Sequence, residues 1–120
     1  MENMNLRNYA YIGDAIWEVF IREKTIKITE NSKKLHKITT EKVKASFQAF
    51  LLQNLDEILT DEEKEIARRA RNLPIPIGRR HIQTEYRQAT AFEVLIGYFH
   101  EHDNERLVFV ENYLEKFIEF

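Results

Sequence analysis

The chain contains no cysteine, which excludes disulfide bonds, thiolate zinc sites and cysteine nucleophiles. It has only three glycines and two prolines in 120 residues, and so little turn-forming material argues against a fold built from many β-hairpins. No apolar run approaches the roughly 20 residues of a membrane-spanning helix, and residues 1–8 lack the basic start and apolar stretch of a signal peptide. These absences predict a helical cytoplasmic protein without a membrane segment.

The residues that are present predict one packed helical domain. Hydrophobic residues make up 43% of the chain and aromatic residues 12%, enough for a single core over residues 1–120 and not for a second module. Thr60 and Glu63 form a capping-box pattern. Apolar side chains at helical spacing predict helices over about residues 6–25, 60–71, 85–102 and 104–119, and either one helix or a helix pair over residues 33–58 with a bend at 38–40. Residues 72–83 are the main predicted loop. The expected fold class is therefore all-α.

Charge is distributed unevenly along the chain, although the formal net charge is only −2. Residues 68–87 hold six arginines against one acid, and residues 24–44 hold seven lysines against two acids. Residues 101–120 show the reverse, with six acids and two bases. Because the local potential rather than the total charge steers a polyanion, the chain can present basic surfaces to a nucleic acid.

Two acids, Asp14 and Glu93, each interrupt an otherwise apolar helical stretch. Acidic residues are rarely buried unless they are paired or bind a metal. Small residues lie at helical spacing from each acid, Ala10 near the first and Ala89 and Gly97 near the second, so two helices can approach and share a metal. Oxygen ligands, without cysteine or a histidine one turn away, favour Mg²⁺ or Mn²⁺ over Zn²⁺. From these residues alone, solvated acids or an ion pair with an arginine stay open as alternatives.

Two segments of the chain carry a family resemblance. Residues 11–18 read Tyr-Ile-Gly-Asp-Ala-Ile-Trp-Glu, and residues 86–98 read Tyr-Arg-Gln-Ala-Thr-Ala-Phe-Glu-Val-Leu-Ile-Gly-Tyr. The first resembles the Gly-Asp-Ala signature helix of ribonuclease III catalytic domains, and the second resembles their other acidic helix. With Arg-Arg-Ala-Arg-Asn at residues 68–72 between them, the chain looks most like the Mini-ribonuclease III branch, which lacks a double-stranded-RNA-binding domain.

The resemblance implies a ribonuclease III catalytic domain over residues 1–120, acting as a homodimeric, Mg²⁺-dependent endoribonuclease on double-stranded RNA. Asp14 and Glu93 match the catalytic acids that hold the metal, which polarises the scissile phosphate and activates a water. Cleavage then leaves 5′-phosphate and 3′-hydroxyl ends. The implied substrate is the precursor of the large-subunit (23S) ribosomal RNA, and a ribosomal protein is a further expected partner.

Departures from full-length ribonuclease III reduce the set of metal ligands. Further acids of that family, four residues before Asp14 and three before Glu93, are replaced here by Ala10 and Thr90. The Mini branch shares these replacements, and they leave the number of metal ions open. Glu18, one turn after Asp14, and Thr90 are candidates for a supporting role behind the metal ligands.

The arginine-rich segment has two interpretations. A run of arginines can be a solvated helix end that complements the helix dipole, or it can grip the phosphates of A-form RNA. The proline-stiffened loop at residues 72–83 and the family resemblance favour a grip. The candidate RNA-binding residues are Arg68, Arg69, Arg71, Arg79, Arg80 and Arg87.

Two other functions stay open at this level. The missing acids suit a catalytically inactive ribonuclease III-like module that binds RNA or the ribosome, and the acidic last helix suits a helical adaptor without a nucleic-acid role. Mg²⁺-dependent cleavage distinguishes an enzyme from the first, and salt-sensitive RNA binding excludes the second.

Overall fold

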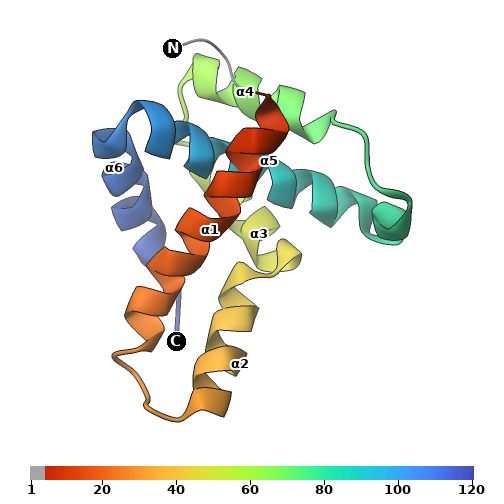
Figure 1. Ribbon diagram of the computed structural model, residues 1–120. Coiled ribbons are helices and arrows are strands. Elements are labelled where there is room, and N and C mark those ends of the chain that lie inside the picture. The colour runs from red at the N-terminus through yellow and green to blue at the C-terminus, as the bar shows by residue number, and fades with distance from the viewer. Residues whose placement is uncertain (1–4) are drawn as a thin grey trace.

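Every regular element in the described part of the chain is a helix (Figure 1). The computed structural model describes residues 5–120, apart from the side chains of Arg79 and Arg80. Its helices are α1 (Leu6–Thr25), α2 (Ser32–Val43), α3 (Ala45–Leu55), α4 (Asp61–Arg71), the 3₁₀ helix η1 (Ile77–Ile82), α5 (Gln83–His102) and α6 (Asn104–Glu115). The prediction of an all-α fold is confirmed. None of these helices is long and apolar enough to cross a membrane.

Helix α5 forms the centre of the core. Its buried residues lie on nearly all sides of the helix, and α1, α3, α4 and α6 pack around it (Figure 1). Phe92, Leu95, Ile96 and Phe99 are each at most 1% exposed. A helix that is apolar nearly all round is typical of a buried element. A polar side chain on such a helix therefore needs a specific partner or function.

Two glycines set how closely α1 and α5 approach. A Cβ atom at Gly13 would lie 1.8 Å from the backbone oxygen of Glu93, and one at Gly97 would lie 1.9 Å from the backbone oxygen of Tyr9. Neither position can carry a larger residue unless the opposite backbone shifts. The predicted close approach of the two acidic helices is confirmed, but the backbones meet at Gly13 and Gly97 rather than at Ala10.

Residues 33–58 form a helix pair, one of the two predicted arrangements, but the predicted bend at residues 38–40 is wrong because the chain breaks at Lys44 instead. Lys44 is extended between α2 and α3. Thr39 stays helical and nearly buried, and its hydroxyl pairs with a threonine hydroxyl of α1 at 3.2 Å. At the end of α2 the indole nitrogen of Trp17 donates to the carbonyl of Lys42 at 2.9 Å, which satisfies one of the carbonyls that a helix end leaves free. Contacts with α1 thus decide where α2 ends.

Most other boundaries follow the sequence signals. Helix α1 covers the predicted residues, and the capping box of Thr60 and Glu63 forms in both directions, at 2.9 and 3.1 Å. The predicted loop at residues 72–83 contains η1, and α5 begins at Gln83, two residues earlier than predicted. Helix α6 ends at Glu115, four residues before its predicted end.

A partly buried ion pair joins α4 to α6. Arg106 donates two hydrogen bonds to the Glu63 carboxylate, at 2.7 and 2.9 Å, and one to the carbonyl of Ile58 at 2.8 Å. Burial acts to raise the pKa of Glu63, but hydrogen bonds from Arg106 and Thr60 outweigh it and lower the pKa below the ordinary carboxyl value. The stability that this pair contributes is therefore present above the ordinary carboxyl pKa and is lost as pH falls through the lowered value.

Replacing Arg106 with methionine should lower the free energy of unfolding by about 2 kcal/mol, because the substitution leaves the Glu63 carboxylate buried and unpaired. The effect is smaller than for a fully buried pair, since 21% of the Arg106 side chain is exposed and solvent screens the charges. Urea denaturation at pH 7 measures the change. Arg68→Met is the matched control, because it breaks an exposed pair with Glu65 and should not change stability measurably. An equal effect of the two substitutions would contradict this role of Arg106.

Candidate active site

The crossing of α1 and α5 brings Asp14 and Glu93 together. Asp14 follows Gly13, whose Cβ position faces the Glu93 backbone, and the two carboxyl groups lie within hydrogen-bonding range of each other. We call these two residues the acid pair. Asp14 is exposed although it interrupts an apolar stretch, whereas Glu93 is partly buried. The convergence that a shared metal site requires is present in the fold.

The pKa of Glu93 is raised to about 8. Burial is the largest cause, the negative charge of Asp14 is the next, and hydrogen bonding between the two carboxyl groups adds to both. The amide of Gln48 acts in the opposite direction. Without a cation, Glu93 therefore keeps its proton at neutral pH.

The raised pKa of Glu93 should make stability depend on pH in the absence of divalent cations. Glu93 stays protonated in the folded protein up to about pH 8 but ionises at the ordinary carboxyl pKa when the chain unfolds. The stability that protonated Glu93 gives the folded protein is therefore fully present below about pH 4 and is lost as pH rises through 8. The wild type should lose unfolding free energy between pH 5 and pH 8. Glu93→Gln, which cannot ionise at residue 93, should lose less than the wild type, by on the order of 2 kcal/mol.

Urea denaturation in EDTA measures this difference between the two proteins. Glu111 titrates in both, because burial and the charge of Glu23 raise its pKa to about 7. The difference between the proteins therefore isolates Glu93. Identical pH dependence of the two proteins would contradict the raised pKa of Glu93.

Two facing carboxylates are a fitting ligand set for Mg²⁺. This ion commonly takes one or two protein carboxylates and completes its octahedral shell with water and substrate phosphate. Within the described residues, no group of three or more acidic, histidine or cysteine side chains is placed to hold a metal, so the acid pair would supply the anionic ligands. A divalent cation there would also balance the like charges that raise the Glu93 pKa.

The sequence patterns do not predict a third residue at this site, Gln48 on α3. Only 2% of Gln48 is exposed, and it shares the buried face of α3 with three leucines. Its amide is near enough to the Glu93 carboxyl to lower the pKa of that group, but Nε2 reaches no acceptor in the described structure with hydrogen-bond geometry. One sequence signal points to Gln48, since a glutamine at an apolar position of a helical repeat is unusual.

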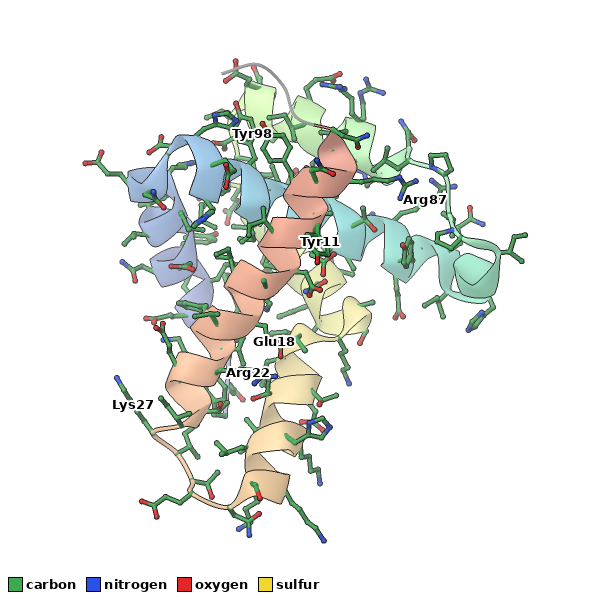
Figure 2. All side chains as sticks on the ribbon, in the orientation of Figure 1. Tyr11, Glu18, Arg22, Lys27, Arg87 and Tyr98 are labelled. Carbon is green, nitrogen blue, oxygen red and sulfur yellow. The ribbon has the colours of Figure 1, made fainter. Side chains whose placement is uncertain are left out.

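The two residues predicted to support the metal ligands have other neighbours. Glu18 forms an ion pair with Arg22, one turn further along α1 (Figure 2). Thr90 lines a small cavity at the start of the loop, together with Arg7 and Arg87. An action of Glu18 or Thr90 on the acid pair stays a prediction.

The arginines predicted to bind RNA differ in their exposure to solvent. Arg68 and Arg69 are exposed on α4, and Arg71 is partly exposed at its end. These three are placed on the surface, as a grip for phosphates requires. Arg79 and Arg80 carry side chains that lie outside the described part of the structure, so their contribution stays a prediction.

Arg87 also holds the loop in place. Its guanidinium donates to the carbonyls of Arg71 at 2.6 Å and Leu73 at 3.3 Å, and Figure 2 shows it reaching from α5 towards this segment. Arg7 of α1, which the sequence patterns do not single out, donates to the carbonyl of Pro74 at 2.8 Å. Two arginines thus fasten the start of the loop to the two helices that carry the acid pair.

Asp14, the exposed member of the acid pair, lies on the open surface of α1. A cavity of about 890 Å³ lies between α3, α4 and α5, and its lining includes Arg68 and Arg71 but neither acid. An exposed carboxylate on a helix surface can meet a long polymer, which a closed pocket would exclude. The geometry therefore suits a macromolecular substrate.

Several known proteins are similar to this chain in sequence. The family model for the ribonuclease III domain matches residues 7–104. The chain belongs to the ribonuclease III domain family. Mini-ribonuclease 3 of Gloeobacter violaceus is 37% identical over 117 residues, which cover 98% of this chain and 87% of the relative. A Mini-ribonuclease 3-like protein of Ilyobacter polytropus is 38% identical over 110 residues, which cover 83% of this chain and 84% of that protein.

A solved structure shares the fold of this ribonuclease III domain. The crystal structure of protein FN1578 from Fusobacterium nucleatum superimposes with a TM-score of 0.81 at 29% identity and covers 96% of this chain and 94% of its own. The resemblance predicted from the two acidic helices is confirmed. As a member of the ribonuclease III family, the chain is an endoribonuclease, and the family acts on double-stranded RNA with divalent metal ions.

Proposed function

We propose that this ribonuclease III domain cuts double-stranded RNA at the acid pair in an Mg²⁺-dependent reaction, leaving 5′-phosphate and 3′-hydroxyl ends. The observation that carries the proposal is the glycine crossing of α1 and α5, which sets Asp14 and Glu93 face to face in an endoribonuclease fold. Mn²⁺ is the alternative ion, because carboxylate and water ligands suit both ions.

Asp14 and Glu93 have different proposed roles at this site. When bound, the ion supplies positive charge that stabilises the reacting phosphate and makes water more acidic. Glu93 fixes one side of the site from the buried helix α5, and the exposed Asp14 faces the substrate. Both carboxylates must be ionised to act as ligands, and the pKa of Glu93 is about 8 without a cation, so cleavage at limiting Mg²⁺ should increase with pH up to about 8.

Basic side chains on two elements offer a path for the duplex. Exposed lysines of α2, including Lys33, Lys34 and Lys37, complement the exposed Arg68 and Arg69 of α4. Figure 1 shows α4 at the top and α2 at the bottom, with the crossing of α1 and α5 between them, so a duplex that contacts both basic elements would pass the acid pair. Contacts of this kind recognise the backbone and shape of A-form RNA rather than its sequence.

A labelled RNA duplex and its separated strands, incubated with and without Mg²⁺, test the proposed reaction. We expect cleavage of the duplex alone, its loss in EDTA, and product ends that a ligase accepts because they carry 5′-phosphates. Equal cleavage of single strands, or cleavage that EDTA does not affect, would contradict the proposal.

We further propose that the natural substrate is the 23S ribosomal RNA precursor, processed in the cytoplasm with a ribosomal protein as partner. The support is the resemblance to the Mini branch and the relatives that bear the name Mini-ribonuclease 3. Primer extension on precursor RNA, before and after incubation with the protein, tests this substrate. Cleavage at scattered positions, without a defined end, would count against it.

A homodimer is the proposed assembly, and the outward face of α1 is its proposed interface. Tyr11 is 84% exposed and Val19 52% exposed, with the exposed Ala15 between them on the same face. Figure 2 shows Tyr11 on the open side of α1. An apolar strip beside the acid pair suits a two-fold contact with a second copy, which would place two acid pairs on one duplex.

Tyr11→Ser should therefore weaken the dimer by at least about tenfold, because aromatic side chains commonly anchor such interfaces. Light scattering coupled to size-exclusion chromatography measures the mass at several concentrations. Ile77→Ser is the matched control, because Ile77 is 80% exposed on η1, away from this face, and should leave the dimer unchanged. A dimer that survives Tyr11→Ser but not Ile77→Ser would place the interface elsewhere.

An RNA-binding module without cleavage is the second candidate function. The observation that favours it is the small set of metal ligands. Within the described residues, no third acidic, histidine or cysteine side chain joins Asp14 and Glu93 to form a larger metal-binding group. The duplex assay separates the two candidates, because a module would retain RNA without cutting it.

A further inference from the structure

Gln48 carries a buried hydrogen-bond donor beside Glu93 that makes no hydrogen bond of normal geometry. Its Nε2 is the one buried side-chain nitrogen or oxygen within the described residues that reaches no partner with normal hydrogen-bond geometry. Buried polar groups are nearly always paired. An exception next to two facing carboxylates therefore points to a ligand-dependent role rather than to chance.

The helix that carries Gln48 faces the acid pair from a third direction. Helix α3 packs against α5, and the Gln48 amide lies close enough to the Glu93 carboxyl to lower its pKa. The other fully or nearly buried residues of α3 are Leu51, Leu52 and Leu55. An apolar side chain at residue 48 would continue that face, so packing alone does not require an amide.

An unpaired buried donor destabilises the folded protein, and replacing it with an apolar group of the same shape is commonly neutral or stabilising. Proteins retain such unfavourable groups chiefly where function needs them. A carboxylate has two oxygens, and a metal ligand works best when a neighbouring donor fixes its orientation. Nε2 is a donor that cannot bind a cation itself, so it can orient the ligand but not replace it.

We infer that Gln48 is a positioning residue for the metal site: its Nε2 donates to the Glu93 carboxylate and would hold that group in the orientation in which, together with Asp14, it binds a divalent cation. The inference rests on the metal site of the proposed function. Three helices then contribute one side chain each, with Asp14 from α1, Gln48 from α3 and Glu93 from α5.

Binding of Mg²⁺ without RNA tests this role independently of activity. Thermal unfolding, followed by fluorescence of the single tryptophan, Trp17, is measured over a range of Mg²⁺ concentrations, because a ligand that binds the folded state raises the melting temperature. The proteins are the wild type, Gln48→Leu, Gln48→Met and Asp14→Asn. Gln53→Leu is the matched control, since Gln53 is an exposed glutamine on the same helix.

We expect both Gln48 variants to melt at or above the wild-type temperature without Mg²⁺, and to need about tenfold more Mg²⁺ for the same increase. Gln53→Leu should match the wild type in both respects.

If Asp14→Asn responds to Mg²⁺ as the wild type does, the metal site of the proposed function fails. If Asp14→Asn loses the response but the Gln48 variants keep the wild-type affinity, the positioning role fails and the metal site stands. Gln48 variants that melt well below the wild type without Mg²⁺, or do not fold, would show a structural role instead and overturn the inference.

Discussion

Asp14→Asn should abolish cleavage of double-stranded RNA while duplex binding persists. Asparagine keeps the shape of the side chain but removes the charge that holds the cation beside Glu93. A bound metal supplies several kcal/mol of transition-state stabilisation, so the cleavage rate should fall by about 10³-fold or more. Single-turnover cleavage of a labelled duplex in Mg²⁺ measures this loss.

Two controls separate chemistry from folding and binding. Glu23→Gln neutralises another exposed acid of α1 and should cleave at the wild-type rate. Fluorescence anisotropy in EDTA should give similar duplex affinities for the wild type and Asp14→Asn, because the exposed arginines and lysines supply the electrostatic attraction. Wild-type cleavage by Asp14→Asn would remove Asp14 from the site, and an equal loss in Glu23→Gln would show a general charge effect.

Gly13→Ala should disrupt the α1–α5 crossing and lower the free energy of unfolding by about 3 kcal/mol or more. The new Cβ would lie 1.8 Å from the Glu93 backbone oxygen, and backbone atoms cannot move aside as a flexible side chain can, so the helices must separate. Alanine is otherwise the better helix former by about 1 kcal/mol. Helix propensity alone would make Gly13→Ala more stable than the wild type, so a net loss of stability would have to come from the steric clash.

Gly78→Ala is the matched control for this substitution, because nothing lies within 4 Å of its Cβ position. Urea denaturation should show no loss for Gly78→Ala and a large loss for Gly13→Ala. Folded Gly13→Ala at low temperature should also cleave poorly, since separating the helices moves Asp14 away from Glu93. A Gly13→Ala protein as stable as the wild type would show that the backbones do not meet there.

Local sequence signals predicted the parts of the fold that depend on near neighbours in the chain. The bounds of α1 and the Thr60 capping box follow from helical periodicity and from a cap formed over three residues. The meeting of Asp14 and Glu93 was also predictable, because small residues at helical spacing from the acids mark helices that can approach closely. Gly97 was among those small residues, and it lies at the crossing itself.

Contacts between distant parts of the chain explain what the sequence could not predict. The bond from Arg7 to Pro74 spans 67 positions, and the end of α2 depends on Trp17 from another helix. Asp14 is exposed although its neighbours are apolar, because the apolar residues of α1 continue around to an outward face that includes Tyr11 and that the single chain leaves uncovered. Periodicity alone does not distinguish a core face from such an outward face.

A crystal structure of the protein grown with Mn²⁺ tests the central claim most directly, because anomalous scattering locates that ion without assumptions about activity. We predict one anomalous peak between α1 and α5, bonded to a carboxylate oxygen of Asp14 and one of Glu93, with water completing the shell. A peak at another site, or one bonded to neither acid, would contradict the assignment of the acid pair as the metal centre.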